Sequence, residues 1–255
     1  MQRQHWLVAA GAGAFVATAL LGLPAAVAVD WLAPEALQVT DVRGSLWKGS
    51  ASTVQAGRLR LGPTTWTLSP LALLRGRVGG FVETRLADAQ ISGDLSVGSG
   101  TSIDCENCRY AGSLASLYGV APALRNLSGS ATIELASLAV RDGWPTEAIG
   151  TVRIAGVPIT APGVPPDPGA PSGEFEATVN SKPVPEDGLI EFLIQDGGGP
   201  LELTGQLSLR PPGNYELAGR ARARADAPPD IVNSLNFLGP KAADGSTEIS
   251  MSGSL

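Results

Sequence analysis

The chain has 255 residues, of which 44% are hydrophobic and only 16% are charged, and it contains 32 glycines and 20 prolines. This length and apolar content are sufficient for a folded core, and so many turn-forming residues favour short strands over a bundle of charged helices. The net charge of −6 argues against nucleic acid as a partner, because that binding depends on lysine and arginine neutralising phosphates.

An uncharged stretch of 24 residues, Trp6–Val29, lies near the N-terminus. As a helix rising about 1.5 Å per residue it would measure about 36 Å, which exceeds the hydrocarbon thickness of about 30 Å. Arg3 precedes the stretch and Asp30 follows it, so the positive-inside tendency leaves residues 1–5 in the cytoplasm and residues 30–255 on the other side. We therefore predict a transmembrane anchor over residues 6–29.

A cleaved signal peptide is the competing interpretation of this stretch. Ala26-Val27-Ala28 has the small-x-small form that signal peptidase accepts. Against cleavage, the apolar segment Trp6–Leu23 is longer than a typical signal core and its basic flank is thin. We favour an uncleaved anchor, and both interpretations place residues 30–255 beyond the membrane.

After the anchor, the hydrophobic pattern changes to the period of two that is typical of half-buried strands. Glycine, proline and Asp-Gly turns separate the strand-like runs, so consecutive strands should pair in a mostly antiparallel, twisted sheet. The segment 161–173 contains five prolines and is predicted to be an exposed loop between two halves of the domain. The strands expected before it are residues 37–42, 46–55, 58–61, 65–68, 77–87, 89–97, 129–140 and 148–154.

The C-terminal part carries the clearest pattern. Residues 201–209 and 215–223 alternate apolar or small with polar residues on either side of a Pro-Pro-Gly-Asn turn, which predicts a hairpin. Residues 228–238 have helical spacing, with prolines before them and Gly-Pro after them. Residues 249–255 alternate again as a closing strand. The fold class we predict is mainly β, with one N-terminal transmembrane helix and one short helix near the C-terminus.

The sequence contains no pattern typical of an active site. Its one histidine, His5, lies beside the predicted anchor, so neither a Ser-His-Asp arrangement nor a His-ligated metal site is expected in the domain. A G-x-S-x-G elbow and a Walker-type phosphate loop are both missing from the sequence. We therefore predict no enzymatic activity, no cofactor and no metal.

Cys105 and Cys108 are the only cysteines and have C-x-x-C spacing. That spacing is found in zinc half-sites, redox pairs and local disulfides, but zinc needs about four ligands and the chain offers no others of the usual type. The surroundings indicate a loop between strands rather than the helix N-terminus of a thioredoxin-like pair. We predict a small structural disulfide that clamps this loop in an oxidising compartment.

Two surface features could mark a partner. Arg220, Arg222 and Arg224 should project from one face of a strand as a cationic row, which could contact an acidic protein surface or lipid head groups, or could be an ordinary solvated face that discourages edge pairing. Trp47 and Trp66 could be interface residues, although core anchors are the commoner role at such positions.

The run Gly44-Ser45-Leu46-Trp47-Lys48-Gly49, followed by Trp66 and by Pro70-Leu71, resembles the opening of the type II secretion system protein N family. In that family a G-x-L/V-W-x-G turn, here Gly44, Leu46, Trp47 and Gly49, follows the anchor. The C-terminal part is also similar, from the strand 201–209 through Gly213-Asn214-Tyr215 to the Asp244-Gly245 turn. The resemblance covers the anchor and both ends of the domain, while residues 98–180 agree only in general character.

The resemblance implies an accessory component of the bacterial inner membrane, whose domain lies in the periplasm. It implies a role in exporting folded proteins across the outer membrane through contacts with other secretion components, without enzymatic activity. The family's sheet also resembles that of AsmA-like envelope proteins, so guidance of lipid or another apolar ligand along one sheet face is the alternative function. That alternative requires the face to remain hydrophobic and uncovered along its length.

Overall fold

The computed structural model describes residues 23–32, 37–57, 59–73, 76–98, 102–119, 121, 124–125, 127–159, 171–182, 188–225, 227–238 and 241–254. Residues 6–22 of the predicted anchor and residues 161–170 of the proline-rich loop lie outside this part of the chain. Within the described residues, no helix is both long and apolar enough to cross a membrane.

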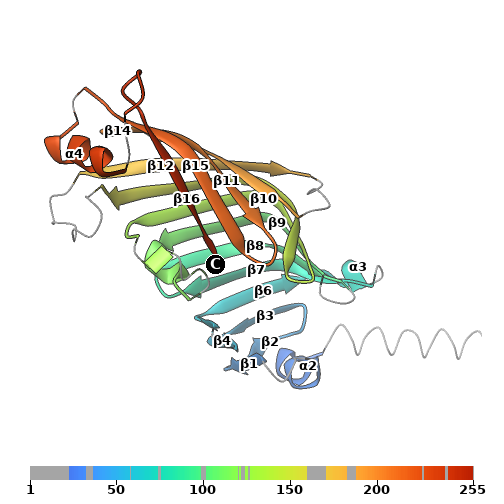
Figure 1. Ribbon diagram of the computed structural model, residues 1–255. Coiled ribbons are helices and arrows are strands. Elements are labelled where there is room, and N and C mark those ends of the chain that lie inside the picture. The colour runs from blue at the N-terminus through green and yellow to red at the C-terminus, as the bar shows by residue number, and fades with distance from the viewer. Residues whose placement is uncertain are drawn as a thin grey trace, which may run out of the picture.

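One antiparallel sheet dominates the molecule, and Figure 1 shows its strong twist from β2 at one edge to β16 at the other. Nearly every strand pairs with the strand that follows it in the chain, as expected for successive short strands. The described part of this sheet consists, in spatial order, of β16 (Thr247–Ser254), β15 (Asn214–Ala223), β14 (Leu201–Arg210), β13 (Ile190–Asp196), β12 (Ser172–Ser181), β11 (Trp144–Pro158), β10 (Ser130–Arg141), β9 (Ile103–Ser113), β8 (Ala89–Val97), β7 (Val78–Leu86), β6 (Thr64–Leu68), β3 (Lys48–Ala51) and β2 (Arg43–Gly44).

A small second sheet and four short helical segments complete the described structure. The small sheet has the order β1 (Leu37–Thr40), β4 (Thr53–Ala56) and β5 (Leu59–Leu61). The helical segments are α2 (Ala25–Leu32), α3 (Pro70–Leu73), the 3-10 turn η1 (Leu114–Leu117) and α4 (Pro229–Leu238). The mainly β, antiparallel class and the short C-terminal helix are therefore confirmed.

The register gives the large sheet one apolar and one polar face, because directly paired residues point to the same side. In β14 and β15, for example, Leu207 pairs with Leu217 and Glu202 pairs with Arg222. The same alternation continues across the neighbouring strands. We call the side that carries the following residues the apolar face: Trp66, Val82, Ile91, Tyr110, Ile133, Val152, Phe175, Ile194, Leu207, Leu217 and Ile249.

The strands have two ends, which we name after the helices in Figure 1. At the α3 end lie the turn 45–47, α3, and the connections that follow β8 and β10. At the α4 end lie the β7–β8 turn, η1 and α4. This definition matters because the two ends are packed differently.

At the α4 end, short segments fold over the apolar face. Leu114 of η1 is buried against Ala89, Tyr110 and Ala131 of three adjacent strands. Ile231 and Leu235, one helical turn apart in α4, are also buried, and α4 contacts β15 and β16. A second buried cluster lies at the α3 end of β11–β13, around Ala148, Val179 and Ile190, with Trp144 packed against it.

One strand prediction needs correction. Residues 46–55 form two strands, because the chain bends at Ser52, whose N–H donates to the Thr40 carbonyl at 3.0 Å. After the bend, β4 pairs with β1 in the small sheet, while β3 pairs with β6 in the large one. Strand-forming residues continue through the bend, so only the pairing partners reveal it.

Four of the described strands were not predicted at all: β2, β9, β12 and β13. The segment around Cys105 and Cys108 was interpreted as a loop, but it lies inside β9. Ser172 and Gly173, assigned to the proline-rich loop 161–173, already belong to β12. The strands on either side of that loop, β11 and β12, are neighbours in one continuous sheet.

Candidate functional site

The turn between β2 and β3 contains the motif residues Gly44, Leu46, Trp47 and Gly49. Gly44 has φ +90°, and a Cβ atom there would lie 2.5 Å from the Lys48 carbonyl oxygen. That oxygen accepts the Ser45 N–H at 2.9 Å, which closes the turn. The first glycine of the motif is therefore required by the backbone itself, since only glycine adopts this conformation without strain.

Trp66 holds the motif turn against the sheet. Its indole Nε1 donates to the Leu46 carbonyl at 3.0 Å, and its ring lies so close to Gly49 that an added Cβ would be 2.5 Å from ring atom Cζ2. The Trp47 carbonyl accepts the Leu68 N–H at 2.7 Å. The half-buried Trp66 therefore packs within the domain, in the anchoring role expected for it.

The motif turn is also bonded to the segment that follows the predicted membrane span. The Leu46 N–H donates to the Leu23 carbonyl at 2.9 Å, and Pro24 forms an antiparallel bridge with Ser45. Ala25, the first residue of α2, is only 1% exposed, and α2 contacts β2. The chain is thus attached to the domain from residue 23 onward.

The structure joins Cys105 and Cys108 in a disulfide that lies within a strand. Compared with β8, strand β9 has one extra residue between them, and Asn107 has φ +52°. Such a β-bulge brings both cysteines to the apolar face. Directly beneath them lies Gly93, where a Cβ would be 2.9 Å from the Cys105 Sγ. The disulfide therefore spans a bulge over a glycine.

The three arginines of the predicted cationic row each face a carboxylate. Arg222 contacts Glu202 at 2.5 Å, and this ion pair raises the pKa of the guanidinium. Arg220 lies 3.6 Å from Glu248, and Arg224 contacts Asp196. These acids come from β14, β16 and β13, so the row is a set of ion pairs rather than a bare cationic ladder.

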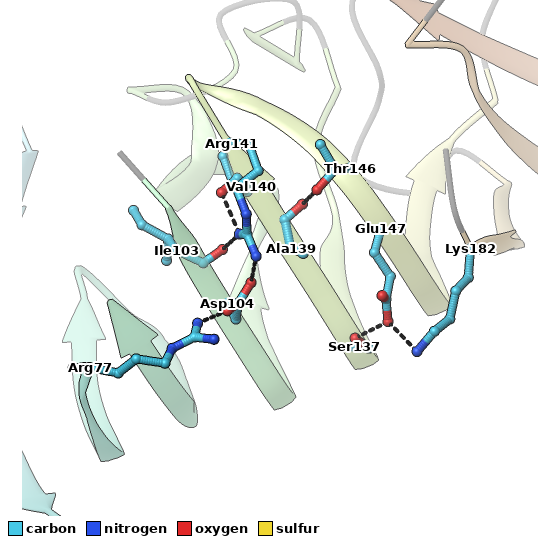
Figure 2. Close-up of polar contacts among 10 residues, drawn as sticks. All are labelled: Arg77, Ile103, Asp104, Ser137, Ala139, Val140, Arg141, Thr146, Glu147 and Lys182. Atoms are coloured by element: carbon cyan, nitrogen blue, oxygen red, sulfur yellow. Dashed lines mark hydrogen bonds and ion pairs between the residues drawn. The ribbon is translucent and has the colours of Figure 1, made fainter. Parts of the chain in front are cut away.

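Figure 2 shows a second polar cluster at the α3 end of the sheet. Asp104 of β9 lies between Arg77 and Arg141 and pairs with both, at 2.6 Å in the case of Arg141. Nearby, Glu147 accepts hydrogen bonds from Ser137 and, at 3.0 Å, from Lys182, and these contacts lower the pKa of its carboxyl group. The residues come from distant parts of the sequence, which contains no signal that would have predicted the cluster.

The polar clusters do not form a metal site. In the part of the chain that the structure describes, no group of three or more His, Cys, Asp or Glu side chains is placed to hold a metal ion. His5 lies outside that part. The arrangement offers ion pairing and hydrogen bonding at an exposed surface.

The apolar face is the largest candidate site. Three parts of this face are covered: the cluster under η1, the cluster beside Trp144, and the strands that α4 contacts. In the area between these parts, the apolar side chains are half-buried. The part contributed by β12 and β13 was not predicted from the sequence, although Ile190, Phe192 and Ile194 recur at every second position and could have revealed β13. The central half-buried residues are Val152, Phe175, Ile194, Leu207 and Leu217.

Comparison with known proteins gives one consistent result. The sequence profile of the family described as "Type II secretion system (T2SS), protein N" matches residues 35–250. A protein of Vibrio cholerae named type II secretion system protein N is 38% identical over 82 residues, which are 31% of this chain and 32% of the relative. The match thus spans about a third of that relative's length. No solved structure matches the chain significantly.

Proposed function

The chain belongs to the type II secretion system protein N family, and we propose that it is an accessory, non-catalytic component of the machinery that exports folded proteins across the outer membrane. The observation that carries this proposal is the extent of the family match. Residues 35–250 include every described strand from β1 to β15 and the start of β16, so the shared unit comprises nearly all of both sheets.

We also propose that the N-terminal segment stays attached as a single inner-membrane anchor, with its N-terminus in the cytoplasm and the β domain in the periplasm. The packing of α2 supports an earlier end for this anchor than residue 29. Ala25 is buried and Pro24 pairs with Ser45, so the span would end by about residue 22.

Deletion of the gene in the native host tests the secretion role. We expect proteins that normally leave the cell to accumulate in the periplasm, and complementation with the intact gene to restore their export. Complementation with Gly44→Ala should restore less export than Gly57→Ala, because both glycines have positive φ but a Cβ clashes only at Gly44. Normal secretion after deletion would contradict the proposal.

Fractionation of the native host tests the anchor separately. The full-length protein should remain in the inner-membrane pellet after alkaline extraction, and the N-terminus of the purified protein should begin at or near Met1. A mature protein that begins at Val29 would show that the segment is a cleaved signal. In that case the domain would be soluble in the periplasm, and the sheet would be unaffected.

Contact with other secretion components is proposed through the row of Arg220, Arg222 and Arg224. Arg220 is the most accessible of the three, since its side chain is 64% exposed and its pair with Glu248 is long. Such exposed pairs contribute little to folding stability, so they can be exchanged for contacts with a partner at low cost. Loss of crosslinking to other secretion proteins in Arg220→Glu, but not in Arg85→Glu on β7, would support this surface.

A second function is supported by the apolar face, which runs through all strands from β6 to β16. We propose as the alternative that lipid or another apolar ligand binds along it, as in AsmA-like proteins. Large half-buried apolar surfaces commonly mark binding sites. Native mass spectrometry of the domain extracted from envelope membranes should then detect bound phospholipid, and a protein free of lipid under mild extraction would count against this function.

The disulfide is proposed to form in the periplasm and to hold the bulge of β9. Thiol labelling of protein expressed with its native N-terminus should find Cys105 and Cys108 unreactive before reduction and reactive after it. Free thiols before reduction would contradict this assignment.

A further inference from the structure

Three apolar side chains form an exposed row at the α3 end of the apolar face. Val78, Val97 and Ile103 are 50%, 45% and 44% exposed. They are neighbours, because Val78 pairs with Val97 and Val97 pairs with Ile103 on three consecutive strands. Leu71 of α3, 71% exposed, lies at the same end. Single exposed apolar residues are common, but a contiguous group indicates a contact surface.

The charges next to this row are turned away from it. Arg77 and Arg141 both pair with Asp104, which alternates with Ile103 and therefore points to the polar face (Figure 2). Arg141 also donates to the Ile103 carbonyl at 3.2 Å and to the Val140 carbonyl at 2.8 Å. These bonds fix the backbone under the row while leaving the row itself without a charged side chain.

The row lies on the side of the molecule to which the N-terminal segment is attached. Leu23 bonds to Leu46 in the motif turn, and that turn bonds through Trp47 to Leu68, immediately before α3. In the sheet, β3 is followed by β6, β7, β8 and β9. The motif turn beside β3 is therefore at most four strand spacings, or about 19 Å, from the row. An anchor that ends by residue 22 would therefore enter the bilayer close to this row.

We propose that Leu71, Val78, Val97 and Ile103 form a membrane-contact rim that rests in the head-group layer of the bilayer holding the anchor. The inference depends on the proposed anchor. An uncharged apolar row next to a membrane tether matches the interfacial region, where apolar side chains enter the boundary between head groups and acyl chains. The rim fixes the orientation of the domain, with the α3 end at the membrane and the α4 end directed away from it.

Spin labelling of the full-length chain in vesicles tests the rim. Single labels would be attached to Leu71→Cys, Val97→Cys and Ile103→Cys with the native disulfide intact, in vesicles of phosphatidylethanolamine and phosphatidylglycerol in equal parts. Leu193→Cys is the matched control, because Leu193 is 58% exposed but lies on the polar face of β13. We expect the ratio of oxygen to nickel-chelate accessibility to be several-fold higher at the rim positions than at position 193.

The possible results separate the rim from the anchor on which it depends. If the chain floats with the vesicles but the rim labels match position 193, the rim is wrong and the anchor stands. If the chain does not float with the vesicles, the anchor fails and the rim fails with it. Rim labels shielded from both oxygen and nickel would show a protein cover, such as a second copy, and would also overturn the proposal. Leu71 lies outside the sheet, so its label reports on the rim even where a label in a strand disturbs folding.

Discussion

Leu114 and Ile231 at the α4 end of the sheet are 1% and 0% exposed, whereas Val78, Val97 and Ile103 at the α3 end keep between 44% and 50% of their surface in solvent. All five are aliphatic, and the sheet that carries or contacts them is continuous. The difference arises because η1 and α4 fold back over the apolar face at the α4 end, whereas the buried cluster at the α3 end lies over β11–β13 and does not include residues of β7–β9. The first arrangement contributes to folding stability, and the second leaves apolar surface available for contact.

The largest effect on folding stability is expected from a substitution in the buried cluster under η1. Leu114→Ala would remove a fully buried side chain from the cluster with Tyr110 and Ala131, and should lower the free energy of unfolding by about 2–5 kcal/mol. Urea unfolding followed by circular dichroism measures this. Leu193→Ala, at an exposed position, is the control and should change it by about 0.5 kcal/mol or less. Equal effects of the two substitutions would mean that η1 does not close a core.

A smaller effect is expected in the motif turn at the α3 end. Gly44→Ala would place a Cβ 2.5 Å from the Lys48 carbonyl at φ +90°, and should cost about 1–3 kcal/mol through strain. Gly57→Ala, at φ +58° with open space around it, should cost less. Thermal unfolding of the two variants makes the comparison. If Gly57→Ala is the more damaging, the turn does not depend on the close approach of Lys48.

The attachment of η1 should depend on pH through Asp88. Its carboxylate accepts hydrogen bonds from the Ser116 hydroxyl, from the Ser113 hydroxyl at 2.9 Å and from the Ser113 N–H at 3.0 Å. These bonds, that of Ser116 first, lower the pKa of Asp88 from 3.8 to about 2. Because the folded-state pKa is the lower one, the stabilisation is complete above the ordinary value of 3.8 and is lost as the pH falls toward 2.

NMR titration of the Ser113 amide measures the pKa of Asp88, because the Ser113 N–H donates a hydrogen bond to the Asp88 carboxylate. In the intact protein, the shift should titrate with a midpoint near 2, and in Asp88→Asn the titration should disappear. A midpoint at the ordinary value would show that the two serines do not hold the carboxylate in solution.

The smallest effect on stability is expected in the rim. Val97→Ser should change the free energy of unfolding by about 0.5 kcal/mol or less, because the side chain is already half in solvent. The same substitution at Val179, on the same face but 1% exposed, should be several-fold more damaging. Urea unfolding of the pair compares the rim with the buried cluster over β11–β13 at the same end of the sheet. Similar losses at the two positions would indicate that the rim is packed in solution.

Local patterns were sufficient where each element depended mainly on its own residues. The hairpin of β14 and β15 follows from alternation around a Pro-Pro-Gly-Asn turn, and α4 from its helical spacing between proline and Gly-Pro signals. Local patterns were insufficient where the alternation of apolar and polar residues is interrupted. In β9 the bulge at Asn107 shifts the pattern by one residue, so the segment around the cysteines looked like a loop.

Alternation, turn residues and helix signals in the sequence by themselves determined a mostly antiparallel β domain and a short C-terminal helix, because each depends on residues close together in the chain, while the turn at Gly44 was expected from the family resemblance. Only the tertiary structure decided which strands became neighbours. That pairing divided residues 46–55 between two sheets, placed a carboxylate opposite each of Arg220, Arg222 and Arg224, and set Val78 beside Val97 and Ile103. These contacts join residues far apart in sequence, where local patterns carry no information about register.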